Sequence, residues 1–345
     1  MKGVLLVNLG SPESPSPADV RRYLDEFLMD KRVLDSPYLM RALLVKGIIL
    51  NTRPKKSAAA YQKIWTDEGS PLIVISKKLK SALSLQLDIP VHLAMRYGSM
   101  SIERGIRELS DQGITEILLI PLYPQFAMSS TETVVEKARE VRDRHFPKLS
   151  INHLPAFFNK KLYVEALTSS IDSVLKPVKP DHLLLSYHGL PERHIRKCDI
   201  TQSHCKIDSS CCITSSPAHE FCYRHQCFST SSSIISTLKL DPTFVTTSFQ
   251  SSLGRDPWLA PNTVHILEKL AADGVKNLVV ASPSFVSDCL ETLEEMEMEY
   301  RQLFLDAGGE SFHFVPCLND NPDWVNALAS WTESWKIDQL KTHSL

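Results

Sequence analysis

A histidine and three carboxylates are the residues of this sequence best suited to chemistry. His188 lies in the segment Ser186–His194 (SYHGLPERH), directly after a short apolar run that predicts a strand. Asp288, Glu291 and Glu295 follow a second apolar run, and their spacings of three and four place them on one face of a helix. An imidazole accepts protons around neutral pH and ligates divalent metals, and carboxylates bind hard cations. Together these residue types predict proton transfer and the handling of a metal ion.

Each of these residues also has an ordinary structural explanation. A single histidine among 12 is more often part of the packing, and further glutamates around Asp288 suggest a solvated acidic helix face. A helix N-terminus also stabilises carboxylates that have no function. Position argues for function, because both groups follow predicted strands, and ligands bind at the carboxyl edge of an open α/β sheet.

Cysteines are concentrated in one polar segment, residues 198–227, which predicts an insertion that binds metal. Six of the eight cysteines fall there, namely Cys198, Cys205, Cys211, Cys212, Cys222 and Cys227. Thiolates in a reducing compartment bind zinc or iron–sulfur clusters, but the absence of a CxxC spacing weakens the zinc-ribbon interpretation. His204, His219 and His225 are further candidate ligands, and free or redox-active thiols are the alternative.

Other residues that follow predicted strands are candidates for ligand contact. Trp258, between two prolines, is suited either to ordinary packing or to a rigid wall for a flat ligand. Ser129 and Ser130 either cap the next helix or bind a carboxylate at its N-terminus. Tyr123 precedes them, and Arg96 either pairs with a carboxylate or braces the structure.

Apolar runs that alternate with helical patterns predict the elements that position these residues. Strands are expected near 3–9, 91–96, 116–122, 150–154, 181–187, 243–248, 277–282 and 311–316. Helices are expected over 18–28, 102–112, 131–144, 263–273, 288–305 and 321–336. Alternation of this kind predicts parallel sheets with crossover helices. We therefore expect an α/β fold of two Rossmann-like, doubly wound domains, each with a four-stranded parallel sheet and with a cleft between them.

The expected domain limits are 1–155, 156–320 and a C-terminal helix, 321–345, that packs on the first domain. The chain has 345 residues, 43% of them hydrophobic and 23% charged, and its net charge of −2 gives no indication of nucleic-acid binding. Neither a GxGxxG motif after a strand nor a P-loop motif occurs. The apolar segment 36–54 is too interrupted to span a bilayer, and is either a buried core helix or an apolar lip that touches lipid. A cytoplasmic protein is expected.

Taken together, these motifs resemble the ferrochelatase family, and the resemblance covers nearly the whole chain. The segments that carry it are Leu6–Pro12, Gly69–Leu72, Tyr123–Gln125, Ser186–Arg193, Ser248–Pro261 and Phe285–Glu295. The resemblance implies two Rossmann-like domains and insertion of Fe²⁺ into protoporphyrin IX, the last step of haem synthesis. It implies a bacterial type with an internal cysteine-rich segment.

The resemblance also implies roles for the candidate residues. His188 would accept a pyrrole proton or help to deliver iron, and Glu291 would lie opposite it across the macrocycle. Asp288 and Glu295 would continue an acidic path for protons or metal, and Trp258 would form a wall of the cleft. The remaining candidates for cleft or propionate contacts are Tyr123, Arg96, Ser129 and Ser130. The segment 36–54 would be an active-site lip that meets a membrane surface, which places the protein in the cytoplasm at the periphery of the inner membrane.

The sequence departs from the family pattern in ways that bear on the cofactor and the substrate. Cys289 stands where many relatives have histidine, and a cluster would have to use the 198–227 segment because the C-terminal cysteines of animal relatives are missing. The resemblance favours a two-iron, two-sulfur cluster over zinc. Glu13, where coproporphyrin-specific relatives often have tyrosine, favours protoporphyrin. The alternatives are a chelatase for coproporphyrin or for cobalt or nickel, and a non-enzymatic iron–sulfur or haem-binding sensor.

Overall fold

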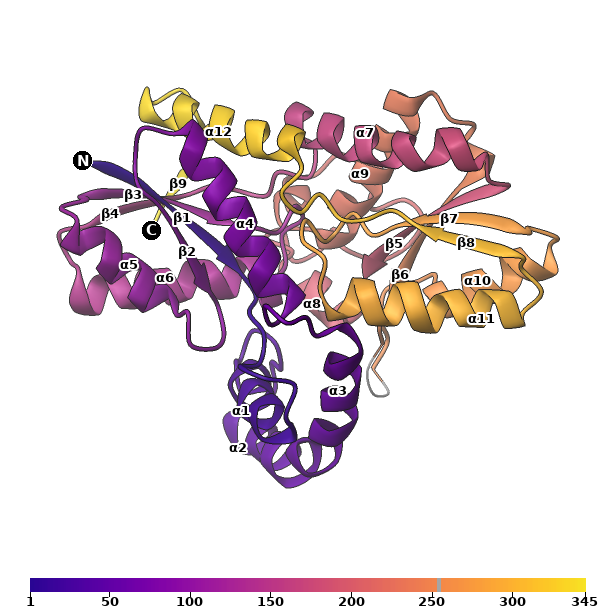
Figure 1. Cartoon of the computed structure of the whole chain (residues 1–345), viewed down its shortest axis with the longest axis horizontal. Helices are drawn as coiled ribbons and strands as arrows, with labels where there is room; N and C mark the ends of the chain where they lie inside the picture. The colour runs from indigo at the N-terminus through magenta and orange to yellow at the C-terminus, as the bar shows by residue number, and fades with distance from the viewer. Residues whose placement is uncertain (253–255) are drawn as a thin grey trace. The chain divides into compact units, whose positions relative to one another are not determined.

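The computed structural model describes residues 1–252 and 256–345, which form two compact units (Figure 1). The first unit comprises Met1–Tyr123, Met128–Pro155 and Asn319–Leu345. The second comprises Pro124–Ala127 and Ala156–Leu318. The C-terminal segment that begins at Asn319 is thus part of the first unit.

The first unit is built on a mixed sheet whose strand order is β2-β1-β3-β4-β9. Its strands are β1 (Lys2–Asn8), β2 (Val91–Met95), β3 (Glu116–Pro121), β4 (Ser150–His153) and β9 (His343–Ser344). The first four are parallel, as predicted, and β9 adds an antiparallel edge strand that was not predicted. Two residues without an apolar run give no strand pattern, so β9 could be found only from its pairing.

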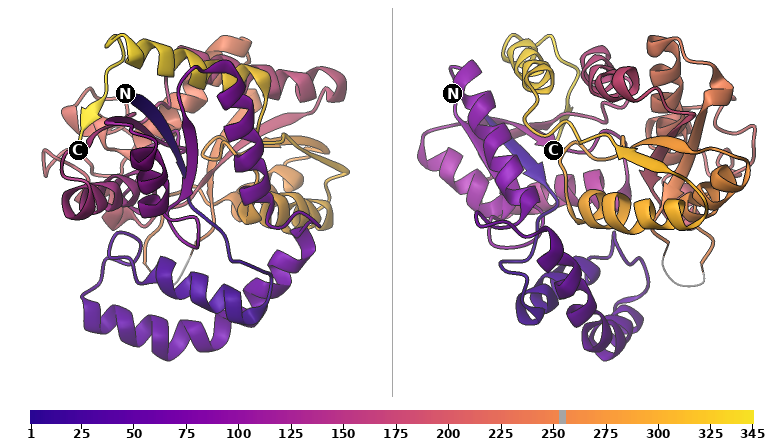
Figure 2. Two further views of the ribbon diagram at one scale, coloured as in Figure 1. Left: turned by 60° about the vertical axis from the view of Figure 1, so that its left-hand side comes forward. Right: turned by 45° about the vertical axis from the view of Figure 1, so that its right-hand side comes forward.

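Helices cover both faces of this sheet, so its strands are continuous apolar runs (Figure 2). On one face lie α5 (Ile102–Asp111) and α6 (Thr133–His145), and on the other lie α4 (Pro71–Gln86) and α12 (Pro322–Lys336). The core between sheet, α5 and α6 includes Leu5, Ile106 and Leu119, all fully buried. Truncation of one of these side chains to alanine should cost about 2–5 kcal/mol.

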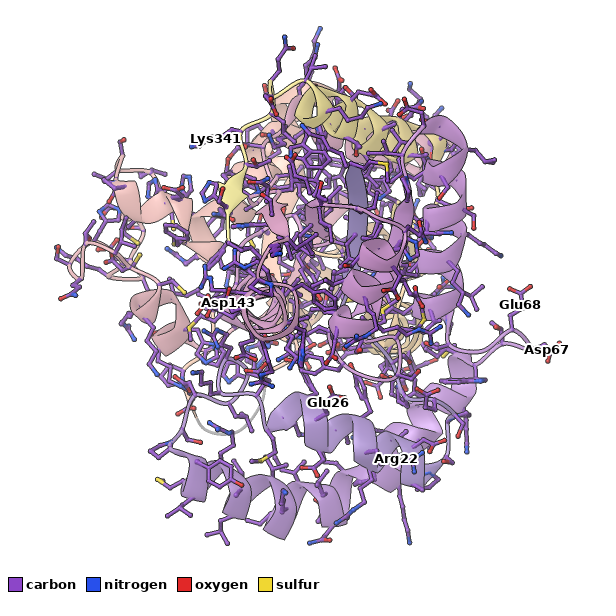
Figure 3. All side chains as sticks on the ribbon, turned by 90° about the vertical axis from the view of Figure 1, so that its left-hand side faces the viewer. Arg22, Glu26, Asp67, Glu68, Asp143 and Lys341 are labelled. Carbon is purple, nitrogen blue, oxygen red and sulfur yellow. The ribbon has the colours of Figure 1, made fainter. Side chains whose placement is uncertain are left out.

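A tight turn precedes α4 and contains the start of the Gly69–Leu72 motif. Thr66 and Gly69 exchange backbone hydrogen bonds, and Gly69 has a φ of +114°, a conformation that L-residues rarely adopt. Asp67 and Glu68 at the tip of the turn project away from the ribbon (Figure 3). Pro71 then begins the helix, where its missing N–H costs nothing.

The segment between β1 and α4 is helical and carries exposed apolar side chains. It contains α1 (Pro17–Leu28), α2 (Tyr38–Ala42), the π-helix η1 (Leu43–Ile49) and α3 (Leu50–Ile64). Val45 and Leu50 pack inwards with Leu28. The large side chains exposed to solvent are Tyr38, Leu39, Met40, Leu43, Leu44 and Ile48. A buried core helix, one of the two interpretations of this segment, does not fit that exposure.

The second unit has an all-parallel sheet with the strand order β6-β5-β7-β8. Its strands are β5 (His182–His188), β6 (Val245–Gln250), β7 (Asn277–Ala281) and β8 (Ser311–Phe314). Its helices are α7 (Lys161–Val178), α8 (Glu192–Lys197), α9 (Tyr223–Leu238), α10 (Thr263–Ala272) and α11 (Arg301–Asp306), with the short 3₁₀ turns η3 (Pro217–Glu220) and η4 (Pro242–Phe244). In both units the second strand flanks the first, and the third and fourth lie on its other side.

The two sheets confirm the predicted α/β class with two doubly wound domains. The eight predicted strands are all present, each within two residues of its expected limits. The helix expected over 288–305 differs, because the π-helix η5 (Glu291–Tyr300) precedes α11 there. Hydrogen bonds from residue i to i+5 widen the turn, which sequence spacing alone does not reveal. Within the described residues, no helix is long and apolar enough to cross a membrane.

Candidate active site at the switch point of the second unit

The strand order of the second sheet creates a switch point between β5 and β7. Chain connections leave these two neighbouring strands in opposite directions, so the loops after them open a crevice at the carboxyl edge. His188 is the last residue of β5, and Asp288 and Glu291 follow the end of β7. The fold therefore brings the predicted histidine and the predicted carboxylates to the same edge of one sheet.

The backbone and ring of His188 are fixed by hydrogen bonds on several sides. Its N–H donates to Ser284 Oγ over 3.0 Å, and its carbonyl accepts from the hydroxyl of Tyr223 over 2.8 Å. Ring nitrogen Nδ1 lies 2.7 Å from the carbonyl oxygen of Gly189. Because a carbonyl only accepts, Nδ1 must carry the proton, and in the neutral ring Nε2 then keeps its lone pair. His188 is thus arranged to accept a proton through Nε2.

Trp258 packs beside the loop that follows His188. Pro191 and Trp258 form an isolated bridge, and a methyl group added to Gly189 would lie 2.5 Å from the carbonyl of Gln250 and 3.3 Å from the Trp258 ring. Only glycine therefore permits this approach of the two chains. The middle of the Ser248–Pro261 motif, residues 253–255, lies outside the described residues.

The carboxylates after β7 lie in partly or fully buried positions with specific partners. Asp288 is buried and accepts hydrogen bonds from the Thr292 hydroxyl over 3.0 Å and from the backbone N–H of Cys317 over 3.3 Å. Glu295 accepts from the Ser251 hydroxyl over 2.6 Å and from the Tyr300 hydroxyl over 2.7 Å. Such donors hold each carboxylate in place.

Gln250 connects the histidine side of the site with the acidic side. It pairs with His188 in the register of β5 and β6, and its amide nitrogen lies 3.4 Å from both the Glu291 carbonyl and a Glu295 carboxylate oxygen. The Ser186 hydroxyl donates to its amide oxygen over 3.0 Å. Gln250 belongs to the Ser248–Pro261 motif, but no role was predicted for it. Its place at the end of a strand beside His188 is the feature that could have indicated one.

Burial changes the protonation of two side chains next to this acidic row. Desolvation raises the pKa of the Tyr300 hydroxyl, and the neighbouring Glu295 carboxylate raises it further. Desolvation likewise raises the pKa of the buried Cys289 thiol, with an added contribution from Glu291. At neutral pH, Tyr300 is therefore a fixed hydrogen-bond donor, and Cys289 is a neutral thiol.

The candidates in the first unit have roles within that unit. Arg96 pairs with Asp30 over 2.5 Å and also donates to Thr133. Tyr123 packs against the core beneath α5 and α6. Ser129 and Ser130 are half-buried in the π-helix η2 (Met128–Glu132), which leads into α6. Contact of these four residues with substrate stays a prediction.

Four of the six clustered cysteines lie close to one another in the loops before α9. The Cys212 thiol interacts with those of Cys211 and Cys222, and the Cys205 thiol interacts with that of Cys222. Cys227 is fully buried in α9, where desolvation raises its pKa, and it interacts with the Tyr223 hydroxyl and with Cys212. Cys227 therefore differs from the group of four thiols in lying within a helix and not in or beside the loops.

The group of four, Cys205, Cys211, Cys212 and Cys222, is surrounded by hydrogen-bond donors. The Arg224 guanidinium lies 3.1 Å from Cys212 Sγ and 3.6 Å from Cys211 Sγ. The backbone N–H of His225 donates to Cys222 Sγ over 3.5 Å. Burial raises the pKa of Cys205 to about 11, so the thiol is protonated unless a metal displaces the proton.

Three histidines line the other side of this segment. The rings of His219 and His225 stack with centroids 3.6 Å apart, and His204 lies 3.3 Å from His219 between ring nitrogens. Their ring nitrogens face the carbonyl oxygens of Cys211 and Cys212. Within residues 1–252 and 256–345, no three His, Cys, Asp or Glu side chains are arranged to hold a metal ion. Metal ligation by any of these residues is therefore a prediction.

Comparison with known proteins identifies the family. A family model described as Ferrochelatase matches residues 1–335. Proteins named ferrochelatase from Opitutus terrae, Ectopseudomonas mendocina and Azotobacter vinelandii are 47%, 50% and 48% identical to the chain. These matches cover 97%, 94% and 94% of the chain and 97%, 95% and 96% of the relatives.

Solved structures show the same fold at low sequence identity. One is SirB from Bacillus subtilis with Fe³⁺, with a TM-score of 0.54 and 13% identity over 96% of this chain and 94% of that one. Another is the sirohydrochlorin chelatase SirB from Bacillus subtilis subspecies spizizenii in complex with cobalt, with a TM-score of 0.55, 12% identity and the same coverage. The resemblance expected from the sequence motifs is confirmed, and the chain belongs to the ferrochelatase family of porphyrin-metallating lyases.

Proposed function

We propose that this enzyme inserts ferrous iron into protoporphyrin IX and that His188 and Glu291 carry out the reaction. The observation that carries this assignment is the position of both residues at the switch point of one sheet, with Nε2 of His188 unprotonated in the neutral ring. Metallation replaces two pyrrole N–H bonds by bonds to iron, so each turnover releases two protons. A neutral imidazole held by its backbone is suited to take the first of them.

The carboxylates provide a route for Fe²⁺ and for the protons that are released. Gln250 contacts the backbone carbonyl of Glu291 and the carboxylate of Glu295, which follows on the same helix, and Asp288 precedes both. Oxygen ligands suit Fe²⁺ before it reaches the pyrrole nitrogens, and a carboxylate that has lost its metal can accept a proton. Asp288 and Glu295 are therefore proposed to pass iron or protons between solvent and Glu291.

The assignment is tested by metallation of protoporphyrin with Fe²⁺, or with Zn²⁺ as a stable substitute. Wild-type protein should form the metalloporphyrin, and His188→Ala and Glu291→Gln should lose most of the rate. Parallel assays with coproporphyrin and with Co²⁺ or Ni²⁺ separate the alternative chelatases. Full activity in both variants would overturn the proposed roles.

We further propose that Cys205, Cys211, Cys212 and Cys222 hold a two-iron, two-sulfur cluster. The mutual contacts of these thiols and the donors at Arg224 and His225 fit the charge of ligated thiolates. A bound cluster would cross-link the loops between α8 and α9 and could exchange one electron. Iron and acid-labile sulfide in purified protein, with visible absorption, support the cluster, whereas one zinc per chain without colour supports the alternative.

The exposed apolar side chains of α2 and η1 support a peripheral contact with a membrane surface. Leu39 and Leu43 are 80% and 73% exposed, an unusual state for side chains of this size. A greasy porphyrin could be taken up at such a surface. We therefore place the enzyme in the cytoplasm at the periphery of the inner membrane, and flotation with vesicles tests the contact.

A further inference from the structure

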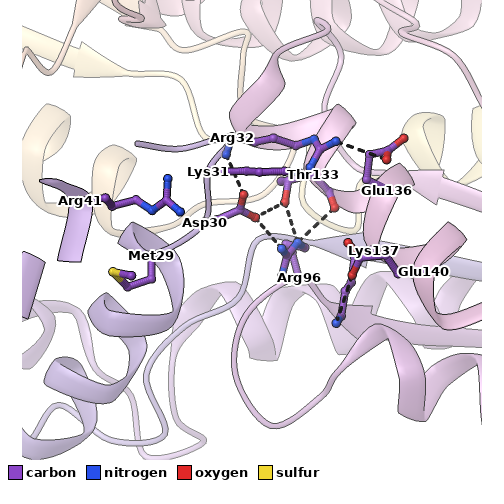
Figure 4. Close-up of a pocket in the computed structure, with 10 residues that line it drawn as sticks. All are labelled: Met29, Asp30, Lys31, Arg32, Arg41, Arg96, Thr133, Glu136, Lys137 and Glu140. Atoms are coloured by element: carbon purple, nitrogen blue, oxygen red, sulfur yellow. Dashed lines mark hydrogen bonds and ion pairs between the residues drawn. The ribbon is translucent and has the colours of Figure 1, made fainter. Parts of the chain in front are cut away.

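We propose that a cavity in the first unit binds the phosphate headgroup of an anionic phospholipid. The inference rests on the membrane contact proposed above and gives that contact a chemical specificity. The cavity has a volume of about 260 Å³ and lies between the loop after α1, helix α2, the end of β2 and the start of α6 (Figure 4). All of these elements belong to one unit.

Basic side chains predominate in the lining of this cavity. Five are cationic, namely Lys31, Arg32, Arg41, Arg96 and Lys137, and three are carboxylates. The net charge of the lining is therefore two positive, in a protein whose total charge is −2. A concave basic surface concentrates anions.

Three of the five cations already pair with carboxylates of the lining. Arg96 pairs with Asp30 over 2.5 Å, Arg32 pairs with Glu136 over 3.2 Å, and Lys137 pairs with Glu140 over 3.7 Å (Figure 4). Desolvation would raise the pKa of Asp30, but hydrogen bonds from Thr133 and Arg32 and the charge of Arg96 lower it overall. These pairs form a rigid wall that supplies little net charge to a ligand.

Within residues 1–252 and 256–345, Arg41 has no carboxylate partner, although it is the most buried cation of the cavity. It is only 7% exposed, its Nε has no hydrogen-bond partner, and its Nη1 donates only to the carbonyls of Leu34 and Ser36. Figure 4 shows its guanidinium directed into the cavity. A buried charge without a counterion is costly, and a phosphate oxygen would supply both the missing charge and the missing acceptor.

The neighbours of Arg41 indicate the kind of phosphate that fits. Tyr38, Leu39 and Met40 precede it in the same short helix and are 62%, 80% and 65% exposed. A ligand that satisfies both surfaces has an anionic head and apolar chains, as a phospholipid has. Lys31 and Lys137, at the more open side of the cavity, could contact the same headgroup.

The proposal is tested by partition of the full-length enzyme between buffer and vesicles. Vesicles of phosphatidylcholine alone are compared with vesicles that also contain phosphatidylglycerol. We expect tighter binding to the anionic vesicles, and Lys31→Gln and Lys137→Gln should each weaken that preference roughly fivefold, the effect of removing one charge near the surface. Arg41→Gln should weaken it more, and the lysine variants keep the test valid if this buried substitution unfolds the protein.

Lys77→Gln is the matched control, because Lys77 is an exposed lysine of the same unit on α4, outside the cavity. It should not change the preference for phosphatidylglycerol. The proposal is overturned if the cavity variants keep the wild-type preference, if inorganic phosphate binds while the two vesicle types bind alike, or if the lysine variants instead raise the KM for porphyrin in detergent. If the wild-type enzyme binds neither vesicle, the membrane contact itself fails, whereas metallation in detergent is judged separately.

Discussion

The second unit contains two regions rich in reactive side chains, and they are built in different ways. The site around His188 stands on regular elements, because strand register and the π-helix determine where His188, Gln250 and Glu295 lie. The group of four cysteines stands on loops between α8 and α9 that have little regular structure. The site around His188, whose reaction tolerates little displacement of its side chains, is thus built on the sheet. The four cysteines lie on loops, where a bound metal can draw its ligands together.

Hydrogen bonds to two aspartates, and not regular secondary structure, fix the backbone of the cysteine loops. Asp199 accepts backbone N–H bonds from Thr201, His204 and Cys205, and Asp208 accepts one from Cys211. Burial alone would raise the pKa of Asp199, but a hydrogen bond from the Thr201 hydroxyl and these backbone hydrogen bonds lower it overall. Ionised aspartates therefore fix the turns that carry the thiols.

The largest expected effect is the loss of metallation rate when the site around His188 is mutated. His188→Ala removes the proton acceptor at the switch point and should lower kcat for metallation about 10²- to 10⁴-fold. Glu291→Gln should fall in the same range. Stopped-flow or steady-state assays with Zn²⁺ and protoporphyrin measure the rates, and circular dichroism controls for folding.

The same assay on cysteine variants tests the sensor hypothesis. A non-enzymatic sensor would keep its function in His188→Ala and lose it in the cysteine variants. That order of severity would show that the function depends on the cysteine loops and not on the site around His188.

The second-largest expected effect is the loss of the metal cluster when one of its cysteine ligands is replaced. Cys212→Ser should abolish the visible absorption and the acid-labile sulfide of purified protein, because a cluster with three thiolates is poorly held. Cys198→Ser, outside the group of four thiols, is the matched control and should retain both. Equal loss in the two variants would show that the four ligands are assigned wrongly.

A smaller effect is expected from the outer end of the acidic row. Tyr300→Phe removes one donor to Glu295 without changing the shape of the side chain, and the loss of a hydrogen bond to a charged group corresponds to about 1.5–3 kcal/mol. Glu295 should then be held in place by fewer donors, so kcat for metallation should fall, but by less than in Glu291→Gln. An unchanged kcat would argue that Glu295 takes no part in iron or proton transfer.

The last effect concerns stability in the first unit, away from either region. Burial, together with the charge of His343, lowers the pKa of His153 from 6.5 to about 4. The folded protein then binds fewer protons than the unfolded chain, so the free energy of unfolding should fall as the pH drops from 6.5 towards 4, by at most about 1.4 kcal/mol per pH unit. His153→Gln should flatten this slope in urea titrations, and an unaltered slope would assign it to other groups.

Regular patterns in the sequence were sufficient for most of the architecture and for placing His188 and Glu291 at the same edge of one sheet. Continuous apolar runs located eight strands, and the polar residues that follow them located His188 and the acidic row. The π-helix of Glu291 was missed because a change from i+4 to i+5 hydrogen bonds leaves no clear mark on residue spacing, and the role of Gln250 was missed because its hydrogen-bond partners are distant in the sequence. For the same reason, spacing alone could not distinguish Cys227, which is buried against Tyr223, from the four thiols in the loops.

Strand β9 protects the β4 edge of the first sheet from pairing with another chain. His343 and Ser344 pair with β4, and the N–H of Leu345 reaches the carbonyl of Ile151, so the outermost parallel strand offers no open row of amides on that side. Removal of these last residues would turn the border of the sheet into a template for another chain. Self-association should then appear in truncated protein, even though every residue proposed for metallation is still present.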